Sequence, residues 1–183
     1  MAAPSPPKPV LIISAIISRY DEAYRWACER MTTQFGEIAL ASEGFDHQET
    51  NYYEASMGAN LRKWFVAFAG KADSAALADW KLATNALETE YANLGRHPEN
   101  RPLNLDPGYL TEAKLVLATT KDRDHRLYLR DGIYAEVTLR YQAGAWKSQP
   151  WTYPDYQRPD FHAFFMRCRE YLRSLDRIPP SPN

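Results

Sequence analysis

The amino-acid sequence predicts an α+β two-layer sandwich, in which a ferredoxin-like β-α-β-β-α-β core is extended by a β-hairpin and a C-terminal helix. Short apolar runs alternate with longer segments whose apolar residues recur at helical spacing. In chain order up to residue 119, these segments follow the split βαβ pattern. Beyond that point, two segments of alternating apolar and polar residues flank a turn signal, and a further amphipathic segment follows.

The first half of the chain predicts a strand, a helix and two more strands. Residues 10–17 (VLIISAII) form an apolar run with several β-branched residues, which is typical of a central strand buried on both faces. Asp21 is a candidate N-cap for a helix over residues 21–35, which Gly36 would end. Strands are expected over residues 37–42 and 64–69, separated by an irregular stretch that contains His47, Tyr52 and Tyr53.

The second half predicts two helices and one core strand. Residues 74–92 carry the clearest amphipathic pattern of the chain, and residues 160–175 carry another that begins at Asp160. Residues 93–107 are expected to be a turn-rich connection, because the run from Asn104 to Gly108 combines side chains that favour tight turns. The fourth core strand is expected over residues 114–119.

Residues 125–141 predict a hairpin, and its loop length decides which side chains share a face. A two-residue Asp131-Gly132 turn would mix polar and apolar side chains on both faces. A three-residue loop from Arg130 to Gly132 instead pairs Leu127 with Ala135 and Leu129 with Ile133, so we expect this register. It also places Arg126 opposite Glu136, and gathers on one face Arg126, Tyr128, Tyr134, Glu136, Thr138 and Arg140.

Composition predicts one domain over residues 9–176, with Pro-rich disordered tails at residues 1–8 and 177–183. The 22 Lys and Arg nearly balance the 23 Asp and Glu, so no overall field favours nucleic acid or a membrane surface. We expect Cys28 and Cys168 to be buried thiols. The N-terminus lacks a signal-peptide pattern, and residues 10–17 fall short of the ~20 that span a bilayer, so a cytoplasmic location is expected.

The densest group of chemically useful side chains lies between residues 104 and 156. We expect the polar hairpin face to be the floor of a pocket, walled by residues 104–109 and 151–156. Charged residues there would clamp a phosphate or carboxylate, and tyrosines would stack on a planar ligand. The candidate ligand-binding residues are Asn104, Tyr109, Lys121, Arg126, Tyr128, Tyr134, Thr138, Arg140, Tyr153, Asp155 and Tyr156.

Asp106, His125 and Glu136 are the candidate acid–base groups, and Asp106 is also a candidate ligand for a hard divalent cation. The histidines show no metal-binding spacing such as HExxH, and the Gly70-Lys71 pair lacks the glycine that a P-loop needs. Three functions remain open: a binding domain for a small anionic, nucleotide-like or phosphorylated ligand, a hydrolase or transferase, and a protein-interaction module. The sequence leaves the cofactor unknown.

Five blocks of the sequence resemble the bacterial domain-of-unknown-function family 4416: NLDPGYL, KLVLATT, KDRDHRLYL, GIYAEVTL and WTYPDY. The opening PVLIISAIIS and the segments YYEASMG and LRKWFVAF are also similar to that family, so the resemblance covers residues 9–172. It implies a stand-alone bacterial cytoplasmic protein in which these residues form one unit. It assigns no ligand, activity or residue role.

Overall fold

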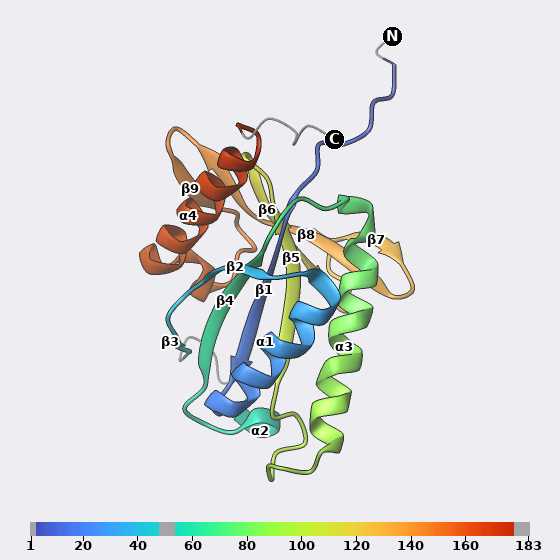
Figure 1. Ribbon diagram of the computed structural model, residues 1–183, viewed down its shortest axis with the longest axis vertical. Coiled ribbons are helices and arrows are strands. Elements are labelled where there is room, and N and C mark those ends of the chain that lie inside the picture. Colours follow the sequence, from blue (N-terminus) through green and yellow to red (C-terminus); the bar gives the residue numbers. More distant parts are fainter. Residues whose placement is uncertain (1–2, 48–53, 178–183) are drawn as a thin grey trace.

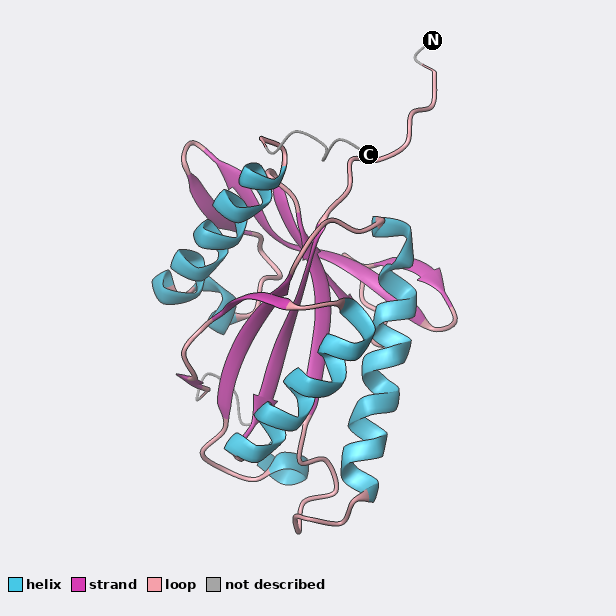
Figure 2. Cartoon of the chain, in the orientation of Figure 1, coloured by secondary structure: helices cyan, strands magenta, loops and turns pink. Residues whose placement is uncertain are grey.

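The fold is a mixed α+β arrangement built on one antiparallel sheet. The computed structural model describes residues 3–47 and 54–177. Its nine-stranded sheet has the order β2-β4-β1-β5-β6-β8-β7, with β3 added to β4 and β9 added to β8. Helices α1 and α3 cover one face of the sheet, and α4 lies over the other (Figure 1; helices cyan and strands magenta in Figure 2).

The predicted core is present in the expected chain order. Strand β1 (Leu11–Ser18) is central, and lies between β4 (Arg62–Phe68) and β5 (Asn104–Leu110). Helix α1 (Asp21–Phe35) leads to β2 (Ile38–Ala41), and α3 (Leu77–Asn93) leads to β5. Two short elements, β3 (Phe45–Asp46) and α2 (Glu54–Met57), lie between β2 and β4, and the 3-10 turn η1 (Ser74–Ala76) precedes α3.

The prediction of a turn-rich connection was wrong at residues 104–107. These residues are the first part of β5, so β5 is the fourth core strand, and β6 (Lys114–Thr119) extends the sheet beyond it. All seven residues of β5 pair with β1, whereas only Gly108, Tyr109 and Leu110 pair with β6. A Cβ on Gly108 would lie 2.2 Å from the Val116 carbonyl oxygen, so glycine permits the close approach of β6.

Pro107 marks the point where β6 leaves β5. The backbone of Leu105 faces this open edge, because its N–H donates to Glu88 (2.7 Å) and its carbonyl accepts from Lys81 (2.7 Å). By the alternation of a strand, Pro107 faces the same edge, and proline has no N–H that would need a partner there. Side chains of α3 thus replace the missing strand.

The hairpin of β7 (Leu127–Arg130) and β8 (Ile133–Gln142) turns at two residues, so the predicted three-residue loop was wrong. Asp131 and Gly132 have φ of 53° and 73°, as a type I′ turn requires. Arg130 rather than Leu129 pairs with Ile133, and a bulge then restores the predicted pairs Leu127–Ala135 and Tyr128–Tyr134. The bulge supplies the extra residue that we had placed in the loop.

The face expected to be dry is only partly covered. Leu127 is 73% exposed and Leu129 is 39% exposed, because β7 is a strand at the edge of the sheet. On the opposite face, Glu136 and Thr138 are buried. Only this part of the polar side is protected, since Tyr128 on the same side is 62% exposed.

The segment that follows β9 forms hydrogen bonds with the part of the β8 edge that no strand covers. Both β7 and β9 (Ala145–Ser148) pair with the same edge of β8, one near each end. Between them, the Val137 carbonyl accepts from the Trp151 indole (3.1 Å), and the Thr138 carbonyl accepts from the Thr152 hydroxyl (2.6 Å). The chain then forms the 3-10 turn η2 (Pro154–Gln157) and α4 (Pro159–Leu175).

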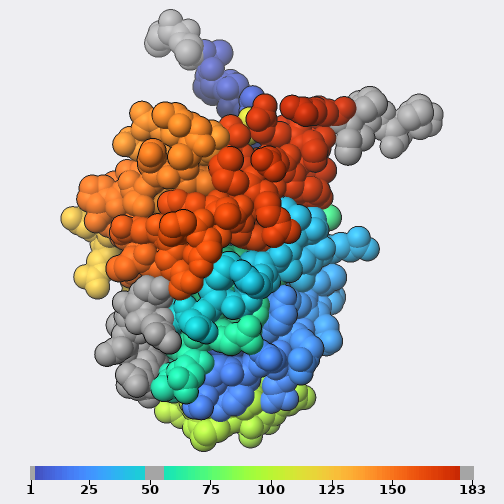
Figure 3. Space-filling view, turned by 90° about the vertical axis from the view of Figure 1, so that its left-hand side faces the viewer, coloured from blue at the N-terminus to red at the C-terminus, as the bar shows by residue number. Residues whose placement is uncertain are grey.

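Helix α4 and the segment before it cover the second face of the sheet (orange to red in Figure 3). An aromatic cluster joins this layer to β4, with Phe65 packed against Phe161, Phe164 and Phe165. Cys168 is buried in this core and Cys28 is half-buried on α1; both are free thiols. Burial raises the pKa of Cys168 to about 12.

Some sequence predictions fall outside the described residues, namely Tyr52, Tyr53, and the tail residues 1–2 and 178–183. Within the described part of the chain, no helix is both long enough and apolar enough to cross a membrane.

Candidate functional site

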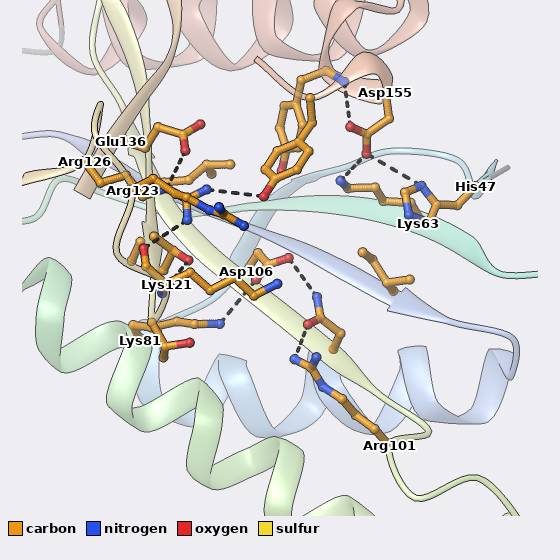
Figure 4. A pocket seen from close by; sticks show the side chains of 18 residues that line it. His47, Lys63, Lys81, Arg101, Asp106, Lys121, Arg123, Arg126, Glu136 and Asp155 are labelled. Carbon is orange, nitrogen blue, oxygen red and sulfur yellow. Dashed lines mark hydrogen bonds and ion pairs between the residues drawn. The ribbon is translucent and has the colours of Figure 1, made fainter. Parts of the chain in front are cut away.

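A cavity of about 300 Å³ opens where β6 leaves β5. It lies on the α4 side of the sheet, and its described wall is formed by β1, β4, β5, β6, β8, the β6–β7 loop and η2, with Lys81 of α3 and Arg101 reaching it where the strands separate (Figure 4). Charged side chains dominate the described wall: Lys63, Lys81, Arg101, Lys121, Arg123, Arg126, Asp106, Glu136 and Asp155. The same divergence of β5 and β6 that leaves one edge of Leu105 without a strand therefore creates the site.

A buried ion pair attaches η2 to the sheet at one end of the cavity. Lys63 Nζ lies 2.6 Å from Asp155 Oδ2, and both side chains are no more than 5% exposed. The Lys63 ammonium also lies 4.1 Å from the centre of the Tyr156 ring. His47 Nδ1 is 3.6 Å from the same Asp155 oxygen. Because Asp155 also accepts the Tyr156 backbone N–H at 2.9 Å, this pair fixes the conformation of η2.

Arg126 joins three parts of the wall. Its Nε donates to Glu136 (2.8 Å), and its two terminal nitrogens donate to the Lys121 carbonyl (3.0 Å) and the Tyr153 hydroxyl (3.3 Å). Burial acts to lower the pKa of Arg126, but the hydrogen bonds to Tyr153 and Glu136 outweigh it and hold the pKa above its usual value. Arg126 therefore stays charged and holds the β6–β7 loop against β8 and η2.

His125 supports Glu136 from outside the cavity. Its Nε2 lies 3.1 Å from the Glu136 carboxylate, and its Nδ1 lies 3.0 Å from Asp124. The imidazole also stacks on the Trp151 ring, with centroids 5.1 Å apart. Since Glu136 already accepts from Arg126, its carboxylate is held from two sides.

A network around Asp106 forms the other end of the cavity. Asp106 accepts from Lys81 (3.2 Å) and from the Asn104 amide (2.7 Å). The side-chain oxygen Oδ1 of Asn104 accepts a hydrogen bond from Arg101, which also donates to Glu88 (2.8 Å). Because Glu88 holds the Leu105 N–H, the network ties α3 to the open edge of β5.

The two carboxyl groups of this network have opposite pKa shifts. Burial acts to raise the pKa of Asp106, but Lys81, Lys63 and the Asn104 hydrogen bond outweigh it, so the pKa lies below its usual range. Burial also raises the pKa of Glu88, and there the opposing effects of Lys81 and Arg101 do not overcome it. Asp106 is thus held as a carboxylate facing the cavity.

Arg123 differs from the other cations of the wall. Arg123 and Lys121 are exposed, and both extend from the β6–β7 loop toward the cavity (Figure 4). Within residues 3–47 and 54–177, the Arg123 guanidinium makes no hydrogen bond or ion pair. Its charge is available to a molecule in the cavity.

Most of the predicted site residues come together at this cavity. The predicted residues that line it are Asn104, Asp106, Lys121, Arg126, Glu136, Tyr153, Asp155 and Tyr156. Thr138 and His125 contact Glu136 without lining the cavity. The Tyr156 ring lies between Lys63 and Phe165, so it offers little face for a planar ligand.

The remaining predicted residues lie elsewhere. Tyr109 packs with Val116 on the face covered by α3, and Tyr128 and Tyr134 contact each other across the hairpin. Arg140 is exposed between Lys114 and Lys147, its neighbours on β6 and β9. The β-bulge at Thr138 turns Arg140 away from Glu136, because an extra residue shifts the alternation of side chains.

Sequence reasoning did not select His47, Lys63, Lys81, Arg101 or Arg123. Lys63 directly precedes the apolar run of β4, and pairing with β1 and β3 carries it into the interior. The position of Lys81 in the sequence does indicate burial. Lys81 lies four residues after Leu77 and three before Thr84, and this spacing places it on the buried face of α3. A lysine on such a face has to find a buried partner.

Among the described residues, no three His, Cys, Asp or Glu side chains are grouped as a metal site requires.

Comparison with known proteins yields a family. No curated protein and no solved structure matches the chain. A family model described as "Domain of unknown function (DUF4416)" matches residues 7–171, which include every strand and nearly all of α4. The chain therefore belongs to the DUF4416 family.

Proposed function

We propose that the protein binds a small dianionic molecule of the phosphate-monoester type in this cavity. The observation that carries the proposal is the charge of the wall. Its described part holds six Lys and Arg side chains against three carboxylates, in a chain whose overall charge is −1. Arg123, one of these cations, has no ionic partner among the described residues. A phosphate monoester carries about −1.5 to −2 at neutral pH and three acceptor oxygens, so it suits a cationic wall of this kind.

The cations of the wall differ in whether they are paired with a carboxylate, and this difference supports the same proposal. Lys63, Lys81 and Arg126 each contact a carboxylate of the wall, so they shape the cavity. Arg123 has no such partner in the described chain, and a guanidinium matches two phosphate oxygens at once. The ligand's charge is therefore assigned to Arg123, with Lys121 beside it.

Binding is favoured over acid–base catalysis. A general base works best when its pKa lies near the working pH, and the pKa of Asp106 is lowered instead. Glu136 accepts from Arg126 and lies 3.1 Å from Nε2 of His125, and His125 lies outside the cavity wall. These groups hold the site in place.

The test is isothermal titration calorimetry of the full chain with methyl phosphate, a phosphate ester that adds only a methyl group. Arg123→Ala should weaken binding by about 10- to 100-fold, as expected for the loss of hydrogen bonds between charged groups. Arg140→Ala is the matched control, because Arg140 is likewise an exposed arginine but lies on β8 and does not line the cavity. No binding by the unmodified protein, or equal losses in both variants, would refute the proposal.

A further inference from the structure

We infer that the ligand carries, besides its phosphate, a neutral hydroxyl group that donates to Asp106, so that it belongs to the phosphorylated alcohols, the class that includes polyol and sugar phosphates. The inference rests on the proposed function, because it assigns the second end of the same cavity. It concerns the Asp106 network, whose remaining hydrogen-bond acceptor positions a phosphate group alone would not use.

Asp106 retains accepting capacity toward the cavity. A carboxylate has about four acceptor positions on its two oxygens, and Lys81 and Asn104 occupy one on each oxygen. The Asp106 side chain is 27% exposed, whereas its partner Lys81 is only 5% exposed. Arg101 at the same end is 39% exposed, but its guanidinium donates to Glu88 and Asn104, so Asp106 is the accessible acceptor here. An ionised carboxylate accepts hydrogen bonds and donates none.

The surroundings of Asp106 favour a hydroxyl over an ammonium donor. Lys81 Nζ lies 3.2 Å from Asp106, and the charge of Lys63 also acts on this carboxylate. A ligand ammonium would enter beside the positive charges of Lys81 and Lys63, whereas a hydroxyl donates a hydrogen bond without adding charge. Asn104 donates to Asp106 and accepts from Arg101, so the acceptor is preorganised.

The ends of the cavity therefore have complementary roles. Arg123 and Lys121 contribute positive charge and donors from the β6–β7 loop, and Asp106 contributes an acceptor from β5. A plain phosphate ester satisfies only the first end. A cavity of about 300 Å³ is at the small limit of ligand sites, which suits a phosphorylated metabolite of a few carbon atoms.

The test compares three probes of similar size by calorimetry on the full chain: 2-hydroxyethyl phosphate, ethyl phosphate and 2-aminoethyl phosphate. The hydroxyl compound should bind about tenfold more tightly than ethyl phosphate, which is the value of one hydrogen bond to a charged group. The amino compound should bind more weakly than the hydroxyl compound. Asp106→Asn, verified as folded by circular dichroism, should bind 2-hydroxyethyl phosphate and ethyl phosphate about equally.

The outcomes separate this inference from the proposed function. If all three probes bind equally and Arg123→Ala weakens each, the anion site stands and the hydroxyl inference is wrong. Tightest binding of the amino compound, or a hydroxyl preference that persists in Asp106→Asn, also overturns it. If no probe binds, or Arg123→Ala has no effect, the proposed function fails and the inference fails with it. Because the probe series uses the unmodified protein, a misfolded Asp106→Asn variant leaves the comparison decisive.

Discussion

Replacement of Lys63 by Met should strongly destabilise the protein, because it leaves the Asp155 carboxylate buried without its cation. The two side chains are 4% and 5% exposed and their charged atoms are 2.6 Å apart. Removal of one partner from a buried pair typically costs about 3–5 kcal/mol. In a chain of 183 residues, where each kcal/mol corresponds to about 2–4 °C, the melting temperature should fall by roughly 6–20 °C.

The assay is guanidinium denaturation at about pH 8, where histidine is ordinarily neutral. This pH matters because His47 Nδ1 lies 3.6 Å from the same Asp155 oxygen, and a protonated imidazole would replace part of the lost charge. The double variant Lys63→Met with Asp155→Asn should cost less than the two single variants added together, because it leaves no unpaired charge.

Lys71→Met serves as the control, because Lys71 pairs with Asp176 at the surface, where the two side chains are 27% and 58% exposed. An exposed pair contributes about 0–1 kcal/mol. A cost of less than about 1 kcal/mol for Lys63→Met, or equal costs for Lys63→Met and Lys71→Met, would refute the reasoning that this pair holds η2 over the cavity.

Three further predictions follow from the geometry. Gly108→Ala should cost about 1–3 kcal/mol or more, because the new Cβ would lie 2.2 Å from the Val116 carbonyl oxygen; equal melting temperatures of variant and parent would contradict this. Thr152→Val should cost about 1–3 kcal/mol in urea denaturation, since it removes the donor to the Thr138 carbonyl and the acceptor for the Gln149 N–H; an unchanged midpoint would show that the strand-edge bonds add nothing. The pKa of Asp106 is lowered by folding, so its contribution to stability is complete above its unfolded pKa of about 3.9 and is lost as pH falls through the folded value; unfolding free energies measured between about pH 5 and 2 should therefore fall less steeply in Asp106→Asn, and parallel curves would contradict the assignment.

Regular periodicity predicted the elements that pack through one face. The helix of residues 74–92 and the strand of residues 10–17 lie within a residue or a few of α3 and β1, because apolar spacing directly reflects which side is buried. The register of the β7–β8 hairpin was also predicted correctly beyond its bulge, since Leu127 pairs with Ala135. The predicted position of the turn was wrong. A two-residue turn followed by a bulge and a three-residue loop without a bulge give the same pairing beyond the turn, so the sequence pattern does not distinguish them.

The site was less accessible to sequence reasoning, because its parts come from segments far apart in the chain. Lys63 and Asp155 are separated by 92 residues, and nothing local in either segment indicates the other. Arg126 and Glu136 were predicted as a pair because one hairpin contains both. Arg140 was grouped with them by strict alternation, which the bulge at Thr138 breaks.

The misread segment from Asn104 to Gly108 explains why the cavity is where it is. Pro and Gly favour turns in isolation, but pairing with β1 keeps all of these residues extended. On the other edge the same two residues act differently: Gly108 lets β6 approach, and Pro107 presents no N–H for further pairing. Lys81 and Glu88 of α3 then bond to the edge of β5 that β6 leaves open. Because Lys81 is there, its ammonium also contacts the Asp106 carboxylate. The residues that look like a turn are therefore those that open the sheet, and a carboxylate with lowered pKa faces the opening as a consequence.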